Sequence, residues 1–243
     1  FDVFGGIGIS AGIAFARAAK GAYDFEKQFQ QSMKEVATLS NGIKGSLTDY
    51  MNQVMEITRT IPVEANEAAK ALYQIVSAGH DGANGMKVLE ASAKAAVGGV
   101  TDTATAADAI TTVLNAYKLD ASKAQEVSDQ LFTTVRLGKT DFGQLGKSIA
   151  QAAPIAASFG IDIKEVLGAV ASITKQGVPT SEAMTKIRAA ILGTANQLGD
   201  AAFKGRTFQE ALQLIYDKAG GSSTKMKELL GTDAVSYTHL RAH

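Results

Sequence analysis

The apolar residues of this chain recur at the spacing of an α-helix along almost its whole length. Residues 163–175 illustrate the pattern, with Ile163, Val166, Leu167, Val170 and Ile173 forming a single apolar stripe. Alternation of apolar and polar residues never exceeds a few positions, so no segment carries a strand signal. The 243 residues include only 3 prolines, and Ala, Lys, Gln and Glu are abundant, which favours helix. The sequence therefore predicts an all-α fold with no sheet.

Glycine, proline and capping residues divide this pattern into short helices. Two helices are expected between residues 24 and 61, because Asn41–Gly42 and Gly45–Ser46 interrupt the run. Asp162 is expected to cap the following helix in a capping box with Glu165, and Gly177 and Pro179 to end it. Further helices are expected at residues 65–78, 83–97, 104–117, 121–136, 141–158, 163–175, 181–198 and 207–219, with one more turn reaching residue 230.

Three windows align without gaps, and each contains a helix, a turn and a second helix. They start at Ala71, Ala109 and Ala169, so their offsets are 38 and 60 residues. Matching positions carry aliphatic or small side chains, which we expect to point inward: Leu72, Ile110 and Val170; Ile75, Val113 and Ile173; Met86, Ala124 and Met184; Leu89, Val127 and Ile187. Unequal offsets exclude a strict solenoid repeat. We therefore expect degenerate antiparallel helical hairpins.

Five regions follow from these boundaries. Residues 1–22 form an apolar, glycine-rich segment, residues 23–60 two leading helices, residues 61–200 the helical-hairpin core, and residues 201–234 a loosely helical extension. Residues 235–243 (VSYTHLRAH) are similar to a translated sequencing adapter, and the chain opens on Phe1 without a methionine. We therefore expect an internal piece of a longer protein and exclude 235–243 from fold reasoning.

The segment 1–22 allows several interpretations. Its apolar stretch is shorter than the roughly 20 residues of a membrane span, but it is compatible with the end of a longer span or helix. Gly8 and Gly12 also form a small-residue pair suited to helix packing. Residues 6–11 imitate a dinucleotide-binding fingerprint, which requires a preceding strand and a βαβ unit. Because uninterrupted helix follows instead, we reject a nucleotide site.

The sequence offers little chemistry, and we expect no catalytic, cofactor-binding or metal-binding residue. The chain contains 24 basic and 24 acidic residues and no cysteine. This balance argues against nucleic-acid specificity, and the absence of cysteine excludes a thiolate site. His80 is the one histidine outside residues 235–243, and it is interpreted as a solvated loop residue. The tripeptide Gly138-Lys139-Thr140 imitates a phosphate-binding loop, but Thr140 is better explained as a helix N-cap.

Acidic residues are scattered over helical positions that we expect to be exposed, for example Glu67, Asp108, Asp129 and Glu182. A pair of these carboxylates converging in three dimensions stays open at this point. Without a usable histidine, however, a serine or threonine nucleophile has no base in the familiar arrangement.

Between residues 23 and 198 the chain resembles the tape measure proteins of long-tailed bacteriophages and prophages. The resemblance rests on an ordered series of phrases rather than on a catalytic signature. They are FEKQF at 25–29 with MKEV at 33–36, IPVEANEAAKAL at 61–72 with SAG at 77–79, AADAI at 106–110 with NAY at 115–117, VSDQL at 127–131, APIAASFG at 153–160, and QG at 176–177 with IRAAIL at 187–192. Tyr117-Lys118 departs from the family, which has a Phe-Gly-like turn there.

This resemblance implies a structural protein of the virion that occupies the lumen of the tail, sets tail length and scaffolds assembly of the tail tube. It implies assembly in the host cytoplasm and contact with the host membrane during infection. The implied partners are the tail tube protein, tail assembly chaperones, tail tip or baseplate proteins and other tape measure copies. Two alternatives are a helical adaptor or effector interaction domain and a cell-wall-active enzyme that uses one acidic residue in a cleft.

Overall fold

The computed structural model describes residues 4–40 and 47–230, with side chains from residue 21 onward. This part of the chain is helical and contains no strand, as predicted. Its α-helices are α1 (Phe4–Leu39), α2 (Leu47–Thr60), α3 (Ala65–Ser77), α4 (Gly82–Gly99), α5 (Thr103–Ala116), α6 (Ala124–Leu137), α7 (Phe142–Ser148), α8 (Ala153–Ser158), α9 (Ile163–Lys175), α10 (Thr180–Leu198), α11 (Phe208–Lys218) and α12 (Ser223–Leu230). Short 3₁₀ turns lie at Ala121–Lys123 (η1), Ile149–Gln151 (η2) and Asp200–Ala202 (η3).

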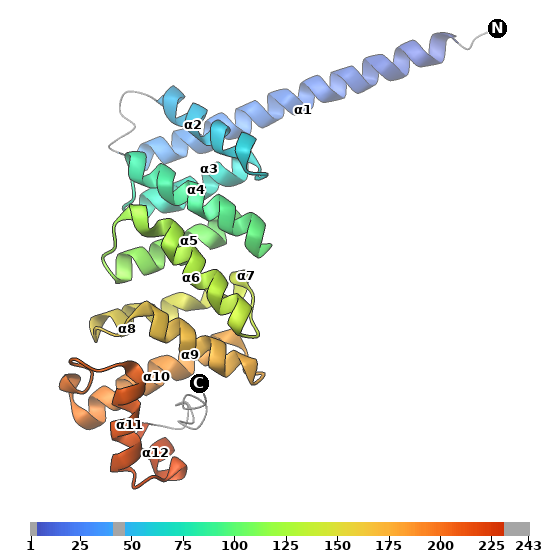
Figure 1. Cartoon of the computed structure of the whole chain (residues 1–243). Coiled ribbons are helices and arrows are strands. Elements are labelled where there is room, and N and C mark those ends of the chain that lie inside the picture. Colours follow the sequence, from blue (N-terminus) through green and yellow to red (C-terminus); the bar gives the residue numbers. More distant parts are fainter. Residues whose placement is uncertain (1–3, 41–46, 231–243) are drawn as a thin grey trace.

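The helices are stacked in two adjacent rows that form an elongated body (Figure 1). In one row α1, α3, α5, the α7–α8 pair and α10 pack each against the next. In the other row α2, α4, α6 and α9 follow one another in the same way. The N-terminal part of α1 projects beyond this body (Figure 1). The structure thus confirms a series of antiparallel hairpins packed side by side.

The inward positions of the three aligned windows form the core between the rows. All twelve aliphatic or small residues at those positions are buried. Val166, from the apolar stripe of residues 163–175, and Ile191 of α10 are fully buried as well. Because a helix places residues three and four apart on one face, the apolar stripes of neighbouring hairpins meet in one continuous core.

The helix expected at residues 141–158 is wrong, because the structure divides it into α7, η2 and α8. Pro154 lies in the first turn of α8, where its missing N–H is tolerated. In the middle of one long helix the same ring would clash with the preceding turn. The N-cap of α7 is Asp141, whose carboxylate accepts a hydrogen bond from the Gln144 N–H at 2.8 Å, so the assignment of the cap to Thr140 is also wrong.

Asp162 is the N-cap of α9, as expected, and its side chain accepts a hydrogen bond from the Lys164 N–H. The capping box expected between Asp162 and Glu165 is wrong, because the Glu165 carboxylate accepts a hydrogen bond from Phe208 of α11. The structure has a capping box at the start of α11, between Thr207 and Glu210. One helix, α1, runs through the boundary expected between residues 22 and 23. No helix among the described residues combines the length and hydropathy needed to cross a membrane.

The turns explain the departure at Tyr117-Lys118. Gly177 ends α9 with a φ of 93°, in the left-handed region that glycine enters readily. At the turn after α5, Lys118 adopts a φ of 52° and so occupies the conformation that a glycine would provide. The hairpin therefore keeps its turn without the glycine, at a local cost of about 1 kcal/mol.

Two helical glycines predict opposite effects of the same substitution. A Cβ at Gly99 would lie 2.6 Å from the Cβ of Phe142, whereas a Cβ at Gly168 meets no atom within 4 Å. Gly99→Ala should lower the free energy of unfolding by about 1–3 kcal/mol through overpacking. Gly168→Ala should raise it by about 0.5–1 kcal/mol because alanine is the better helix former. Urea denaturation followed by circular dichroism measures both, and equal signs would contradict the packing at Gly99.

Candidate functional site

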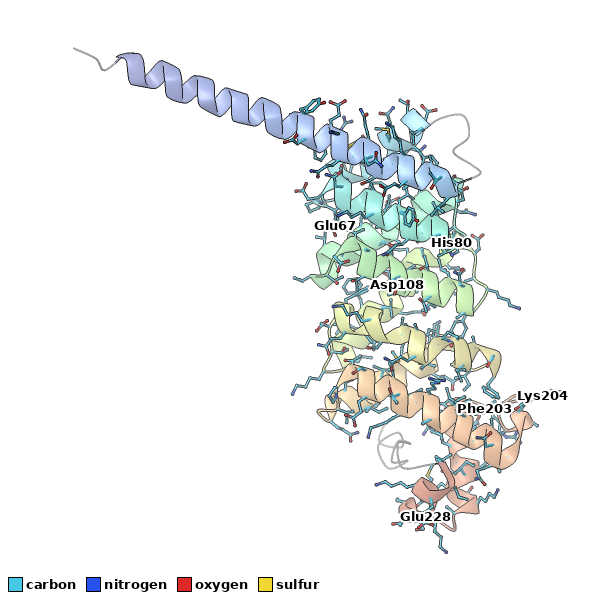
Figure 2. All side chains as sticks on the ribbon, turned by 180° about the vertical axis from the view of Figure 1, so that it is seen from behind. Glu67, His80, Asp108, Phe203, Lys204 and Glu228 are labelled. Carbon is cyan, nitrogen blue, oxygen red and sulfur yellow. The ribbon has the colours of Figure 1, made fainter. Side chains whose placement is uncertain are left out.

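His80 follows the end of α3 and is half-buried rather than solvated as expected. Its Nε2 atom is covered and accepts no hydrogen bond within the described part of the chain. Among those residues no three His, Asp or Glu side chains gather in a geometry that holds a metal ion. Figure 2 shows His80 and Glu67 toward opposite edges of the stack, so the structure does not bring these two residues together.

Asp81 connects the first two hairpins. Its carboxylate caps α4 by accepting a hydrogen bond from the Gly82 N–H at 2.6 Å. It also accepts a hydrogen bond from the Ser40 hydroxyl at 2.6 Å. Tyr50 of α2 lies nearby, and its burial together with the negative charge of Asp81 raises the pKa of its phenol to about 12. The cluster therefore contains a neutral phenol and a carboxylate that already serves as a helix cap.

Glu67 is not the exposed residue that its sequence position suggested. It is half-buried on α3, and its Oε1 accepts hydrogen bonds from the Thr103 N–H at 2.5 Å and from the Thr103 hydroxyl at 2.8 Å. Glu165 of α9 contacts α11 in the same manner by accepting from the Phe208 N–H. Each carboxylate thus supplies an acceptor to the N-terminus of a helix in another hairpin, where the helix dipole favours negative charge.

The other three acidic residues are exposed, as expected. Glu182 forms an ion pair with Lys186 at 3.0 Å, and Asp129 accepts a hydrogen bond from Gln125 at 2.9 Å. Asp108 lies on the exposed face of α5 and is labelled in Figure 2. None of these contacts joins two of the carboxylates.

The segment Gly138-Lys139-Thr140, which imitates a phosphate-binding loop, connects α6 with α7 and contacts residues of α9 and α10. The Lys139 N–H donates to the Thr174 hydroxyl at 3.2 Å, and the hydroxyls of Thr140 and Thr180 are 2.6 Å apart. The Thr180 hydroxyl also lies 3.2 Å from Oε1 of Gln144. These groups therefore form hydrogen bonds within the protein. In a phosphate-binding loop they would instead face the ligand.

Such polar contacts recur between successive hairpins. Their partners are separated by 34 residues in Thr185–Gln151, by 36 in Thr103–Glu67 and by 43 in Phe208–Glu165. A further contact of this kind joins Asn115 and Ala78. The side-chain amide of Asn115 donates a hydrogen bond to the Ala78 carbonyl oxygen at 2.9 Å. Sequence reasoning missed these contacts, although separations close to the length of one hairpin were a usable signal. Their arrangement holds neighbouring hairpins in register.

Several grooves mark the surface of the described stack. One, of about 540 Å³, lies between α9 and α11 and is lined mainly by small or apolar residues such as Gly168, Ala171 and Phe208. Another, of about 760 Å³, lies between the α2–α3 loop and the end of α4. Both lie where neighbouring elements of the stack meet.

Comparisons with known proteins find similarity to phage tail proteins. The family described as "Phage-related minor tail protein" matches residues 51–234. The chain is 31% identical to the probable tape measure protein of Clostridium phage phiCD119 over 163 residues, which are 65% of this chain and 17% of that protein. It is 23% identical to the tape measure protein of Pneumococcus phage Dp-1 over 201 residues, 83% of this chain and 17% of that protein.

The chain therefore spans about a sixth of the length of these relatives. No solved structure matches it. The family match covers most of the chain, from within α2 through α12. The chain belongs to the phage-related minor tail protein family.

Proposed function

We propose that this chain is a segment of a tape measure protein and that its role is structural rather than catalytic. The proposal rests on the sequence similarity to a probable tape measure protein and a tape measure protein. The aligned regions cover 65% and 83% of this chain. The stacked hairpins support it, because the described carboxylates that sequence reasoning singled out serve as helix caps or lie on solvent-exposed faces. In this role the segment lies in the lumen of the phage tail and contributes to its length.

The same proposal assigns the partners. The tail tube protein surrounds the segment, tail assembly chaperones hold it in the host cytoplasm before the tube forms, and tail tip or baseplate proteins meet the full protein at its end. Other copies of the tape measure lie alongside it. Contact with the host membrane belongs to the later stage of infection.

The segment would have one length as a stack of hairpins and a greater length as a continuous helix. Measurement of tail length distinguishes these two states. As a stack, each hairpin adds about one helix spacing, roughly 8–10 Å, to the long axis. As a continuous helix, the 36 residues from 101 to 136 would span about 54 Å, because a helix rises about 1.5 Å per residue. We propose that the segment is compact before assembly and extended within the tail, where contacts with the tube and neighbouring copies replace those between hairpins.

Tail length in the phage that encodes this chain tests the proposal. In-frame deletion of residues 101–136 removes α5 and nearly all of α6. We expect tails to shorten by up to about 54 Å, and by clearly more than the 8–10 Å of one helix spacing, without a change in diameter, as measured by electron microscopy. Shortening by only about 10 Å would indicate that the stack persists in the tail.

A phage carrying Gly168→Ala is the matched control, since it keeps every residue and its tails should retain the parental length. Deletion phages whose tails also keep that length would contradict a ruler role and leave the segment a docking or initiation unit.

A further inference from the structure

The groove between the α2–α3 loop and the end of α4 has an apolar rim. Pro62 and Val63 form one side, and Val97 and Val100 form the other. Val97 is 43% exposed and Val100 is 94% exposed, so both valines present their side chains to solvent. Together these residues give the groove a small apolar surface beside its acidic residues.

Val100 is also in an unfavourable backbone conformation. It lies at the C-cap of α4 with φ 50° and ψ 51°, the left-handed region that β-branched residues avoid. The conformation closes the helix, because the N–H groups of Val100 and Thr101 both donate to the Ala96 carbonyl oxygen. Glycine would satisfy this turn without strain. A valine that is both strained and almost fully exposed adds little to the stability of its own fold, which points to a role in binding.

The charge of the groove is negative. Glu64, Glu67 and Asp102 line it, and none of its lining residues is Lys or Arg. Burial alone would raise the pKa of Asp102, but hydrogen bonds from the side chain and backbone of Thr105 outweigh this effect and lower it, with a smaller contribution from Lys147 on α7. Glu67 is held in place by Thr103. An occupant with basic side chains would therefore complement this surface.

We propose that this groove docks a basic, amphipathic segment of a partner protein. The apolar residues of the partner segment pack over Val97 and Val100. The lysine or arginine side chains of that segment face Glu64 and Asp102. An anionic surface, such as a lipid headgroup layer, would be repelled by the same carboxylates. The inference does not depend on the tail-length role, because binding to the chain is measured without tail assembly.

Fluorescence anisotropy with synthetic peptides tests the proposal on the whole chain. The probe is a labelled peptide with leucine and lysine at helical spacing; a leucine–glutamate peptide and a scrambled leucine–lysine peptide without an apolar face serve as comparisons. We expect the first to bind, and to bind more weakly as salt is added, while the other two bind at least tenfold more weakly. Equal binding of all three peptides, or no binding of the first, would overturn the proposal.

Val100→Gly separates binding from folding, because the two effects have opposite signs. The substitution relieves the left-handed strain, so the midpoint of urea unfolding should rise. It also removes the apolar contact, so peptide affinity should fall about tenfold. A variant that keeps full affinity would show that the peptide binds elsewhere.

Glu64→Gln should reduce affinity about two- to fivefold and weaken its dependence on salt. Glu228→Gln is the matched control, since Glu228 is exposed near the far end of the stack (Figure 2) and should leave affinity unchanged. Sedimentation velocity of the chain alone completes the test. Self-association that Val100→Gly abolishes would assign the groove to a second copy and overturn the basic-segment proposal.

Discussion

Val170→Asp should lower the free energy of unfolding by about 3–5 kcal/mol, because it places an unpaired carboxylate in the layer between hairpins. Val170 is fully buried on α9, which packs against α6 and α10. Burial would raise the folded-state pKa of the new carboxyl above the value of about 4 that it has in the unfolded chain. The destabilisation should therefore be smallest near pH 4 and grow as the pH rises toward 7.

Gly168→Asp is the control for that experiment. It introduces the same side chain two residues earlier on α9, at an exposed position where an added Cβ meets no atom within 4 Å. Its effect should remain within about 0.5 kcal/mol, as is usual for surface substitutions. Urea unfolding at several pH values, followed by circular dichroism, measures both variants. Similar stabilities for the two would mean that Val170 does not face the core.

Phe142→Ala should lower the free energy of unfolding by about 3–5 kcal/mol through lost burial and the cavity that remains. Phe142 is 1% exposed, opens α7 and lies against Phe132 of α6, with ring centroids 4.8 Å apart. It also fills the space beside Gly99 of α4. One side chain thus joins three helices from three successive hairpins, in a chain whose aromatic residues are only 7% of the total.

The matched control is Phe25→Ala. Phe25 lies on α1, is 37% exposed and stacks against Phe29 at a centroid distance of 6.3 Å. Its removal should lower the free energy of unfolding by about 1 kcal/mol or less. Calorimetric unfolding of the two variants compares them directly. A larger loss at Phe25 than at Phe142 would contradict the central position assigned to Phe142.

Much of the fold follows from local signals. The apolar stripe of residues 163–175 predicts α9 and its buried face, because both depend only on helical geometry within one segment. The family follows from the order of its phrases, which the match over residues 51–234 confirms. The break within residues 141–158 was missed although Pro154 marks it, since a proline is tolerated at the start of a helix and the sequence did not show where the second helix begins.

The partnerships between hairpins depend on the tertiary structure. Glu67 was expected to be exposed and Glu165 to pair with Asp162. Only the stacking of α3 near α5 and of α9 near α11 gives these carboxylates their partners at the N-termini of α5 and α11. Val100 is one more valine in the sequence, and only the structure shows that it closes α4 in the left-handed conformation. The sequence by itself determined most of the helices, their apolar inward positions and the family, because these arise from residue spacing along the chain. The contacts between hairpins and the grooves beside them arise from residues 34 to 43 positions apart, and only packing in three dimensions decides which of those residues meet.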